Sequence, residues 1–429
     1  MGSLLKVAIN KVMGLSKSFS FWFAIATIII IPINVGYLPP FMILWFVSWI
    51  IEHRFKFDLI IQSKKSHLLL LSLFIALYIW QLTGMLYSDN PGTGWQNIIR
   101  RISLVMFPII LLSPGEKIKK NGILLLRIFA ISTIAFILYC FVYAFYRSTE
   151  IQNGIFTFNP HQKVFYWLNY FYGTYFSIFQ HPSYLAMYVL ISVFIGFESM
   201  FDKTLRINYR ISWLVFSIVL LSSLYFLSSR TGILTAFLIL PFYFLQKSIV
   251  RRNARFAWLI IIIIIMVFLP LMLKNQRFNT FRKSVSGNSI SEMVNQDERI
   301  IVWKAAFNIA SENLILGVGT GDVNSALLEE HKKEGNLKLV ENKLNAHNQY
   351  IEVLLENGLI GLIFFFSIFV TMFYIAFSEK NILYLLFILT VMIFFGFESM
   401  LNRLAGVSFF ALFSFLIIHT RNGIIGDDK

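Results

Sequence analysis

Long apolar runs recur along the whole chain and are separated by short polar connections. Each run is close to the length that an α-helix needs to cross the roughly 30 Å hydrocarbon core of a bilayer. The pattern predicts an all-α, polytopic membrane protein with about twelve transmembrane helices. The runs cover residues 19–36, 38–51, 67–87, 98–113, 123–146, 182–201, 211–227, 231–246, 256–273, 350–377, 382–399 and 406–420.

Two segments match none of these runs. Residues 147–181 are rich in Tyr, Phe and Trp, as expected of a segment that lies at the outer membrane–water interface. Residues 274–347 are polar and mixed in charge, and we expect them to form the largest loop outside the membrane. The chain then divides into helices 1–9 over residues 1–273, the large loop over 274–347, and helices 10–12 over 348–429.

Within the large loop, apolar residues at helical spacing predict an amphipathic helix over residues 291–310. These apolar residues are Ile300, Trp303, Phe307 and Ala310. The glycine-rich stretch at 317–321 then predicts a turn, because the lysine and the Ser/Thr of a phosphate-binding loop are missing from it.

Lysine and arginine gather in every second connection between the apolar runs. Clusters such as Lys64–Lys65 and Arg251–Arg255 belong to one set of connections, whereas the short connections 34–37 and 88–97 contain no basic residue. Basic residues are retained on the cytoplasmic side of a membrane. Both termini are therefore predicted to be cytoplasmic, and the loop over 274–347 periplasmic. No small-residue cleavage site follows the first apolar run, so we expect an uncleaved first helix.

The composition points to lipid rather than water as the surrounding solvent. Of the 429 residues, 57% are hydrophobic and 14% are charged, whereas soluble domains carry about 25% charged residues. The net charge of +15 lies in the connections, so it reports membrane topology and argues against nucleic acid as a partner. Cys140 is the only cysteine, which excludes an intramolecular disulfide and a thiolate metal cluster.

Five basic residues stand at or beside the predicted outer starts of helices. A helix N-terminus carries a partial positive charge and favours anions, so basic side chains there oppose the helix dipole. The pattern predicts that an anion binds at the outer face. The five residues are Arg100, Arg101, His181, Arg230 and His347.

The sequence around His347 predicts that this residue can act as a proton acceptor. We expect Asn345 to cap the following helix, which places His347 in the first turn. The helix dipole there favours a neutral imidazole, which can accept a proton. Glu352 and Glu356 follow on the same helix, and pairing with an arginine is favoured over a role in orienting His347.

The pentapeptide Gly-Phe-Glu-Ser-Met occurs twice, at residues 196–200 and at 396–400. The predicted topology places the two copies on opposite sides of the membrane. We interpret the repetition as chance.

The region after residue 345 contains a spaced signature. His347 and Asn348 are followed, after nine positions, by Gly358 and, after two more, by Gly361. This spacing resembles the signature of the O-antigen ligase and O-antigen polymerase superfamily, in which a histidine precedes Asn, Ser or Gln and the later positions are Gly and then Gly, Thr or Tyr.

Two earlier stretches strengthen the resemblance. Arg230, within Ser-Arg-Thr-Gly, is similar to the family's arginine at the start of a helix before the large periplasmic loop. Arg299 and Trp303, followed by Leu-Gly-Val-Gly at 316–319, are similar to the family's stretch inside that loop. The resemblance is clearest over residues 210–400.

The resemblance implies glycosyl transfer at the outer leaflet of the bacterial inner membrane, from a glycan carried on undecaprenyl pyrophosphate. The family's catalytic histidine corresponds to His347, which would act as general base on the acceptor hydroxyl. Arg230 and Arg299 would bind the pyrophosphate in place of a metal ion, because no Asp-x-Asp motif occurs in an outer loop. The reaction would invert the anomeric centre and need no cofactor. Further candidates for substrate binding are Asn348, His181, Arg100 and Arg101; the two adjacent arginines could contact acceptor phosphates or lipid headgroups.

The residues leave the acceptor open. A ligase, which transfers the glycan to a lipid A–core acceptor, is favoured over a polymerase that extends a growing glycan and over a protein O-oligosaccharyltransferase. The alternative from another class is a flippase for lipid-linked oligosaccharides, which would leave its substrate chemically unchanged. A large loop that carries arginine and histidine on one side of the membrane favours the enzyme.

Overall fold

The computed structural model describes residues 19–53, 63–152, 154–161, 169–251, 298–336 and 345–420. Seven of the described helices are long and apolar enough to cross a membrane, and three shorter apolar helices accompany them. The prediction of an all-α membrane protein is confirmed to this extent, and the expected span at 256–273 lies outside the described residues. The termini and, within the expected loop over 274–347, residues 274–297 and 337–344 also lie outside them.

The helices keep the boundaries that the apolar runs predict, with one exception. The run at 98–113 is divided between two helices, α5 and α6, and the run that starts at residue 231 is α11. The helices after the first one, Phe19–Ile33, are α2 (Leu38–His53), α4 (Lys65–Thr83), α5 (Pro91–Arg101), α6 (Ser103–Leu112), α7 (Glu116–Lys120), α8 (Gly122–Ser148), α9 (Pro182–Phe201), α10 (Ile207–Phe226), α11 (Arg230–Arg251), α15 (Glu298–Glu312), α16 (Val323–Lys333), α18 (Gln349–Ser378), α19 (Ile382–Phe397) and α20 (Leu404–Leu416).

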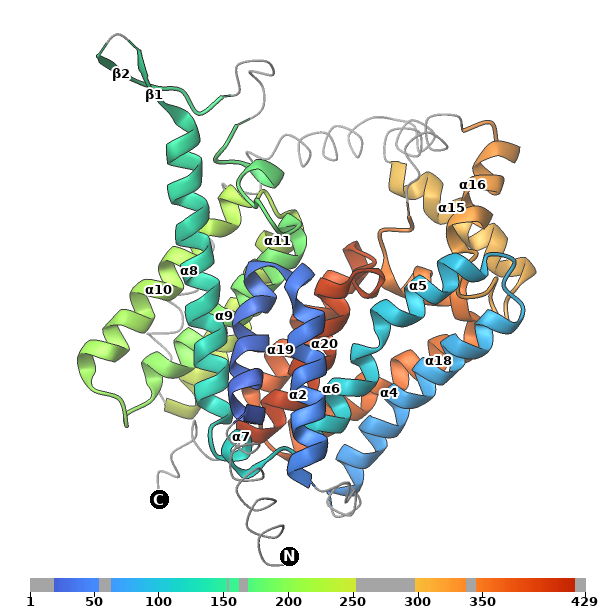
Figure 1. Ribbon diagram of the computed structural model, residues 1–429, viewed down its shortest axis with the longest axis horizontal. Coiled ribbons are helices and arrows are strands. Elements are labelled where there is room, and N and C mark those ends of the chain that lie inside the picture. The colour runs from blue at the N-terminus through green and yellow to red at the C-terminus, as the bar shows by residue number, and fades with distance from the viewer. Residues whose placement is uncertain are drawn as a thin grey trace, which may run out of the picture.

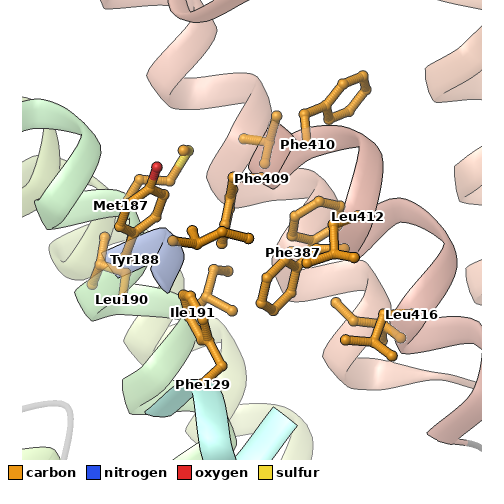
Figure 2. Packing of buried hydrophobic residues seen from close by; sticks show 14 of the residues in the cluster. Phe129, Met187, Tyr188, Leu190, Ile191, Phe387, Phe409, Phe410, Leu412 and Leu416 are labelled. Atoms are coloured by element: carbon orange, nitrogen blue, oxygen red, sulfur yellow. The ribbon is translucent and has the colours of Figure 1, made fainter. Parts of the chain in front are cut away.

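The centre of the bundle is helix α9, which packs against α8, α10, α11 and α19. Aromatic rings from α8, α9 and α20 meet in the core that Figure 2 shows. The ring centroids of Phe129 and Phe413 lie 4.6 Å apart, and those of Tyr188 and Phe409 lie 4.7 Å apart. The Tyr188 hydroxyl donates to the carbonyl of Ala405 at 2.8 Å, so the polar atom of this buried ring is satisfied. This packing fixes the start of α9 relative to the start of α20.

The two ends of the bundle differ in chemistry. At one end, Lys64 pairs with Glu379, which follows α18, and Lys247 pairs with Glu198 near the end of α9 at 2.8 Å. The opposite end holds the starts of α9, α18 and α20. We call it the His347 end, because His347 directly precedes α18 there.

Helices α15 and α16 form a small separate core with the start of α18, seen at the upper right of Figure 1. The core residues are Val302, Ala306, Ile309, Leu327 and Ile351, among others. The expected amphipathic helix is therefore present over 298–312, and residues 291–297 lie outside the described part of the chain. Its predicted face is confirmed in part: Ala310 is buried and Trp303 packs against the small core. Ile300 and Phe307 are exposed, and Val302, Ala306 and Ile309 make the contact beside Ala310.

The aromatic segment after α8 begins with two strands. Helix α8 continues to Ser148, and the chain then forms a hairpin of strands β1 (Thr149–Gln152) and β2 (Ile155–Phe158). The hairpin projects away from the bundle (Figure 1), and the position of residues 147–181 at the membrane interface stays a prediction.

Candidate active site

His347 lies at the point where the chain enters α18. Asn348 is the N-cap of this helix, and its side-chain oxygen accepts from the backbone N–H groups of Tyr350 at 2.9 Å and Ile351 at 3.2 Å. The prediction that Asn345 is the cap is wrong, and so is the position of His347 in the first turn. Asn345 instead accepts from the backbone N–H of His347 at 3.1 Å.

The backbone of His347 has a left-handed conformation, with φ 45°. A non-glycine residue adopts this conformation at a cost, and such residues cluster at functional sites. A second non-glycine residue of this kind, Ser228 with φ 53°, precedes Arg230 by two positions. Two of the sequence-predicted site residues thus stand beside strained backbone.

The imidazole of His347 faces a carboxylate. Its Nδ1 lies 3.2 Å from Oε2 of Glu398, the residue that ends α19. The other carboxylate oxygen of Glu398 accepts from the Ser183 hydroxyl at 3.2 Å. Burial alone would raise the pKa of Glu398, but the hydrogen bond and charge of His347, with the charges of His181 and Arg299, lower it below its usual value. Glu398 is therefore a carboxylate at neutral pH.

Sequence reasoning missed Glu398, although a signal was present. Glu398 and Glu198 are the glutamates of the two Gly-Phe-Glu-Ser-Met copies. Glu198 lies at the far end of the bundle, where it accepts from Tyr243 and Lys247, both at 2.9 Å. Each copy places a glutamate beside a basic partner, Lys247 for the buried Glu198 and His347 for the partly exposed Glu398, at opposite ends of the bundle.

His181, at the start of α9, interacts electrostatically with the same carboxylate. It is the N-cap of this helix and its Nδ1 accepts from the backbone N–H of Ser183 at 3.4 Å, with Pro182 as the first helical residue. Desolvation by the surrounding protein lowers the pKa of His181; the Glu398 charge opposes this effect, and the charges of Arg403 and His347 add to it.

Arg230 is the first residue of α11 and is exposed. Ser229 caps the helix, because its hydroxyl accepts from the backbone N–H of Gly232 at 3.1 Å. Helix α11 runs parallel to α9: a Cβ atom placed on Gly232 would lie 3.0 Å from the Cβ of Ala186, and Lys247 pairs with α9 further along. Arg230 therefore stands at the His347 end.

Arg299 reaches the site from the small core. The indole N–H of Trp303, one turn later on α15, donates to the carbonyl of Ala346 at 2.8 Å. Residues four apart lie on one helix face, so Arg299 is on the face of α15 that meets His347. The charge of Arg299 lowers the pKa of Glu398. His347, Glu398 and Arg299 are thus neighbours although they are far apart in the sequence.

A sequence model described as O-antigen ligase matches residues 215–366. The matched part of the chain is similar to the O-antigen ligase family. The match includes Arg230, Arg299 and His347, whereas Glu398 and His181 lie outside it. A comparison with curated proteins finds no match.

The glycines of the O-antigen ligase signature have a structural reason. Gly358 interrupts α18 with φ 64° and ψ −164°, a conformation that is essentially restricted to glycine. A Cβ atom at Gly358 would lie 2.1 Å from the carbonyl oxygen of Ile315. At this break, the backbone N–H of Leu359 donates to Leu314 at 2.8 Å, and that of Val318 donates to Leu355 at 2.8 Å. The segment before α16 therefore docks on α18 through its backbone.

The predicted turn at 317–321 is confirmed, since Gly317 and Gly319 have positive φ angles of 76° and 105°. Thr320 donates to the carbonyl of Gln81 at the end of α4, at 2.6 Å. The turn joins the small core to the bundle, which holds Arg299 in place beside His347.

Arg101, which the sequence predicts to bind a substrate, is buried and paired in the structure. It lies in the last turn of α5, not at a helix start, and its residue is 2% exposed. Its guanidinium pairs with Glu356 at 2.5 Å and donates to Asn402 at 2.8 Å. This guanidinium is buried and already neutralised, so it is not exposed to a substrate, and loss of either partner would leave an uncompensated buried charge. The expected pairing of Glu356 with an arginine is confirmed.

Glu352 has a structural role too. It is 3% exposed and accepts from Asn402 at 2.7 Å and from Ser399 at 3.2 Å. Gln349 accepts from the backbone N–H of Leu401 at 2.6 Å. Polar groups of α18 therefore hold the 398–402 segment, which carries Glu398.

Metal ligands do not cluster in the described part of the chain: no three His, Cys, Asp or Glu side chains there could hold a metal ion. The positive charges that act on Glu398 at the His347 end come from His347, His181 and Arg299.

Proposed function

We propose that this protein transfers a glycan from undecaprenyl pyrophosphate to a hydroxyl group of a lipid A–core acceptor, as an O-antigen ligase. The observation that carries the proposal is the contact between His347 Nδ1 and Glu398 Oε2 at 3.2 Å, with the charge of Arg299 acting on the same carboxylate. A proton acceptor and a cation for a leaving phosphate are what this transfer needs.

His347 acts as the general base. The hydrogen bond to Glu398 assigns the proton of the neutral imidazole to Nδ1, so the lone pair on Nε2 is available. Nε2 takes the proton of the acceptor hydroxyl while its oxygen attacks the anomeric carbon. The bond from that carbon to the pyrophosphate breaks in the same displacement, which inverts the anomeric centre. Glu398 stabilises the imidazolium that forms.

Arg230 and Arg299 bind the pyrophosphate. The leaving group gains negative charge as its bond to the sugar breaks, and guanidinium groups match phosphate oxygens in geometry and charge. Because two arginines supply this charge, the transfer proceeds without a metal ion. Asn348 contributes by capping α18 and by donating to the carbonyl of Gly396 at 3.2 Å, which ties the start of α18 to the end of α19.

The reaction takes place on the periplasmic side of the bacterial inner membrane. Lysine-rich connections gather at the bundle end opposite His347, where Lys64 and Lys247 pair with glutamates. Basic connections are retained in the cytoplasm, which leaves His347 facing the periplasm and both termini in the cytoplasm.

The acceptor is tested with purified protein in nanodiscs. Undecaprenyl-pyrophosphate-linked glycan is incubated with lipid A–core, with a second lipid-linked glycan, or with a serine-containing peptide. We expect glycan-bearing lipid A–core as the product. Extension of the lipid-linked glycan alone would replace the ligase by a polymerase. If no acceptor is modified, the protein is reconstituted in sealed vesicles, and a donor that moves across them but is recovered unchanged would favour a flippase.

A further inference from the structure

Arg403 is a cation with no role in the proposed transfer. It ends the 398–403 segment, precedes α20, and is exposed. Within the described residues, its guanidinium has no hydrogen bond and no carboxylate partner. Its positive charge nevertheless interacts electrostatically with Arg100 and with His181. Two arginines and a histidine from three helices therefore lie close together.

Arg100 is held in place beside Arg403 by neutral groups. Its Nη1 donates to the side-chain oxygen of Asn97 and to the carbonyl of Asn402, both at 3.0 Å. No carboxylate pairs with Arg100 among the residues that the structure describes. The adjacent Arg101 is the opposite case, because Glu356 neutralises it. A guanidinium that is oriented but not neutralised is suited to an external anion.

The start of α20 packs closely on the start of α9. A Cβ atom placed on Gly406 would lie 2.8 Å from the ring carbon Cε1 of Tyr184. The N-termini of the two helices therefore converge beside Arg403, and their unpaired N–H groups add positive potential. Two carboxylates near this segment are already engaged: Glu398 is hydrogen-bonded to His347 and Ser183, and Glu352 to Asn402 and Ser399.

We propose that Arg100 and Arg403 form a second anion site, which binds a phosphate group carried by the acceptor lipid. This assignment rests on the proposed transferase function. Arg299 approaches His347 from α15, whereas Arg100 and Arg403 come from α5 and α20, at the other end of the 398–403 segment. The donor pyrophosphate and the acceptor phosphate then bind at separate cationic sites, and the general base lies at the junction of the two.

Binding is measured by calorimetry on the full-length protein in phosphatidylcholine nanodiscs, which needs no catalysis. The probes are a short-chain phosphatidic acid, which is a lipid phosphomonoester, a short-chain phosphatidylglycerol, and inorganic phosphate. The variants are Arg403→Gln and Arg100→Gln. Arg147→Gln is the matched control, because Arg147 is also an exposed arginine, lies in the last turn of α8, and among the described residues contacts Tyr143 and Tyr170.

We expect saturable binding of the phosphatidic acid that each site variant weakens about 10-fold, since a charge-assisted hydrogen bond contributes about 1.5–3 kcal/mol. The control should bind as the wild type does. Equal affinity in Arg403→Gln and wild type would overturn the site. Phosphatidylglycerol bound as tightly, with the same dependence on Arg403, would assign the site to bulk lipid headgroups and overturn the acceptor assignment. Inorganic phosphate bound as tightly as the lipid would overturn a lipid ligand.

Transfer kinetics add a second readout. Arg403→Gln should raise KM for a phosphorylated acceptor about 10-fold and leave KM for the donor and the rate with a dephosphorylated acceptor unchanged. A raised donor KM would place Arg403 in the donor site instead. If the wild type transfers to no acceptor, the proposed function fails, while the calorimetry still decides whether the anion site exists.

Discussion

Glu398 provides the sharpest test of the catalytic geometry, because Glu398→Gln keeps the shape of the side chain and removes its charge. Its carboxylate lies 3.2 Å from His347 Nδ1, and the two side chains are 15% and 30% exposed. The amide can still accept the Nδ1 proton, but it cannot stabilise an imidazolium. The rate should therefore fall without loss of the fold.

The magnitude follows from the partial exposure of this pair. A hydrogen bond to a charged group contributes about 1.5–3 kcal/mol, and each 1.36 kcal/mol changes a rate about tenfold. Loss of the charge should lower kcat about 10- to 100-fold. A loss near 10⁴-fold, as seen when a buried triad aspartate is replaced, would require a pair that is less exposed to solvent than His347 and Glu398.

Steady-state transfer kinetics, donor binding and thermal unfolding are measured on Glu398→Gln and on Glu198→Gln. The second variant is the matched control, because Glu198 occupies the same pentapeptide but pairs with Lys247 at the other end of the bundle. We expect Glu398→Gln to lose kcat with unchanged donor binding, and Glu198→Gln to lose thermal stability with kcat retained. Wild-type turnover in Glu398→Gln would refute the dyad, and equal kcat losses in both variants would show that the effect is structural.

Four further outcomes are expected. Arg230→Ala should abolish transfer and Arg230→Lys should retain a trace, because lysine supplies charge without the planar fork; full activity of the alanine variant would remove Arg230 from the mechanism. Gly358→Ala should lower the unfolding temperature and expose α15 to proteolysis, since its Cβ atom would meet the Ile315 carbonyl at 2.1 Å and the backbone strain alone costs about 1–3 kcal/mol; wild-type protease resistance would contradict the docking described above. Burial alone would raise the pKa of Glu379, but hydrogen bonds to His67 and Lys64 lower it from 4.5 to about 2. The ionised carboxylate should therefore contribute fully to the free energy of unfolding above pH 4.5, and this contribution should disappear as the pH falls towards 2. Glu379→Gln should lack this pH-dependent contribution in unfolding experiments. Transfer should be undiminished in EDTA, and a requirement for added magnesium or manganese would oppose the use of arginines in place of a metal.

The sequence predicts the helices well because a bilayer sets the length of an apolar run. The same rule fails where a polar break carries no proline or glycine signal. The run at 98–113 is divided at Ile102, and this break places Arg100 and Arg101 at a helix end instead of a helix start. The face of α15 is predicted only in part, since Ala310 and Trp303 contact the small core as expected whereas Val302 and Ile309 replace Ile300 and Phe307 there.

The site was predictable where a signature carries it and not where a tertiary contact completes it. His347, Arg230 and Arg299 follow from motifs, and the structure places all three at one end of the bundle. Glu398 is 51 residues from His347, and no local pattern links the two. Likewise, only the fold distinguishes Arg101, which pairs with Glu356, from Arg100, which does not pair with Glu356.

The most direct measurement is the single-turnover rate of glycan transfer by His347→Ala in nanodiscs, with donor binding recorded on the same preparation. We predict a rate about 10²- to 10⁴-fold below that of the wild type, because the acceptor hydroxyl loses its general base, with donor affinity retained. Transfer by the alanine variant at the wild-type rate would contradict a catalytic role for His347.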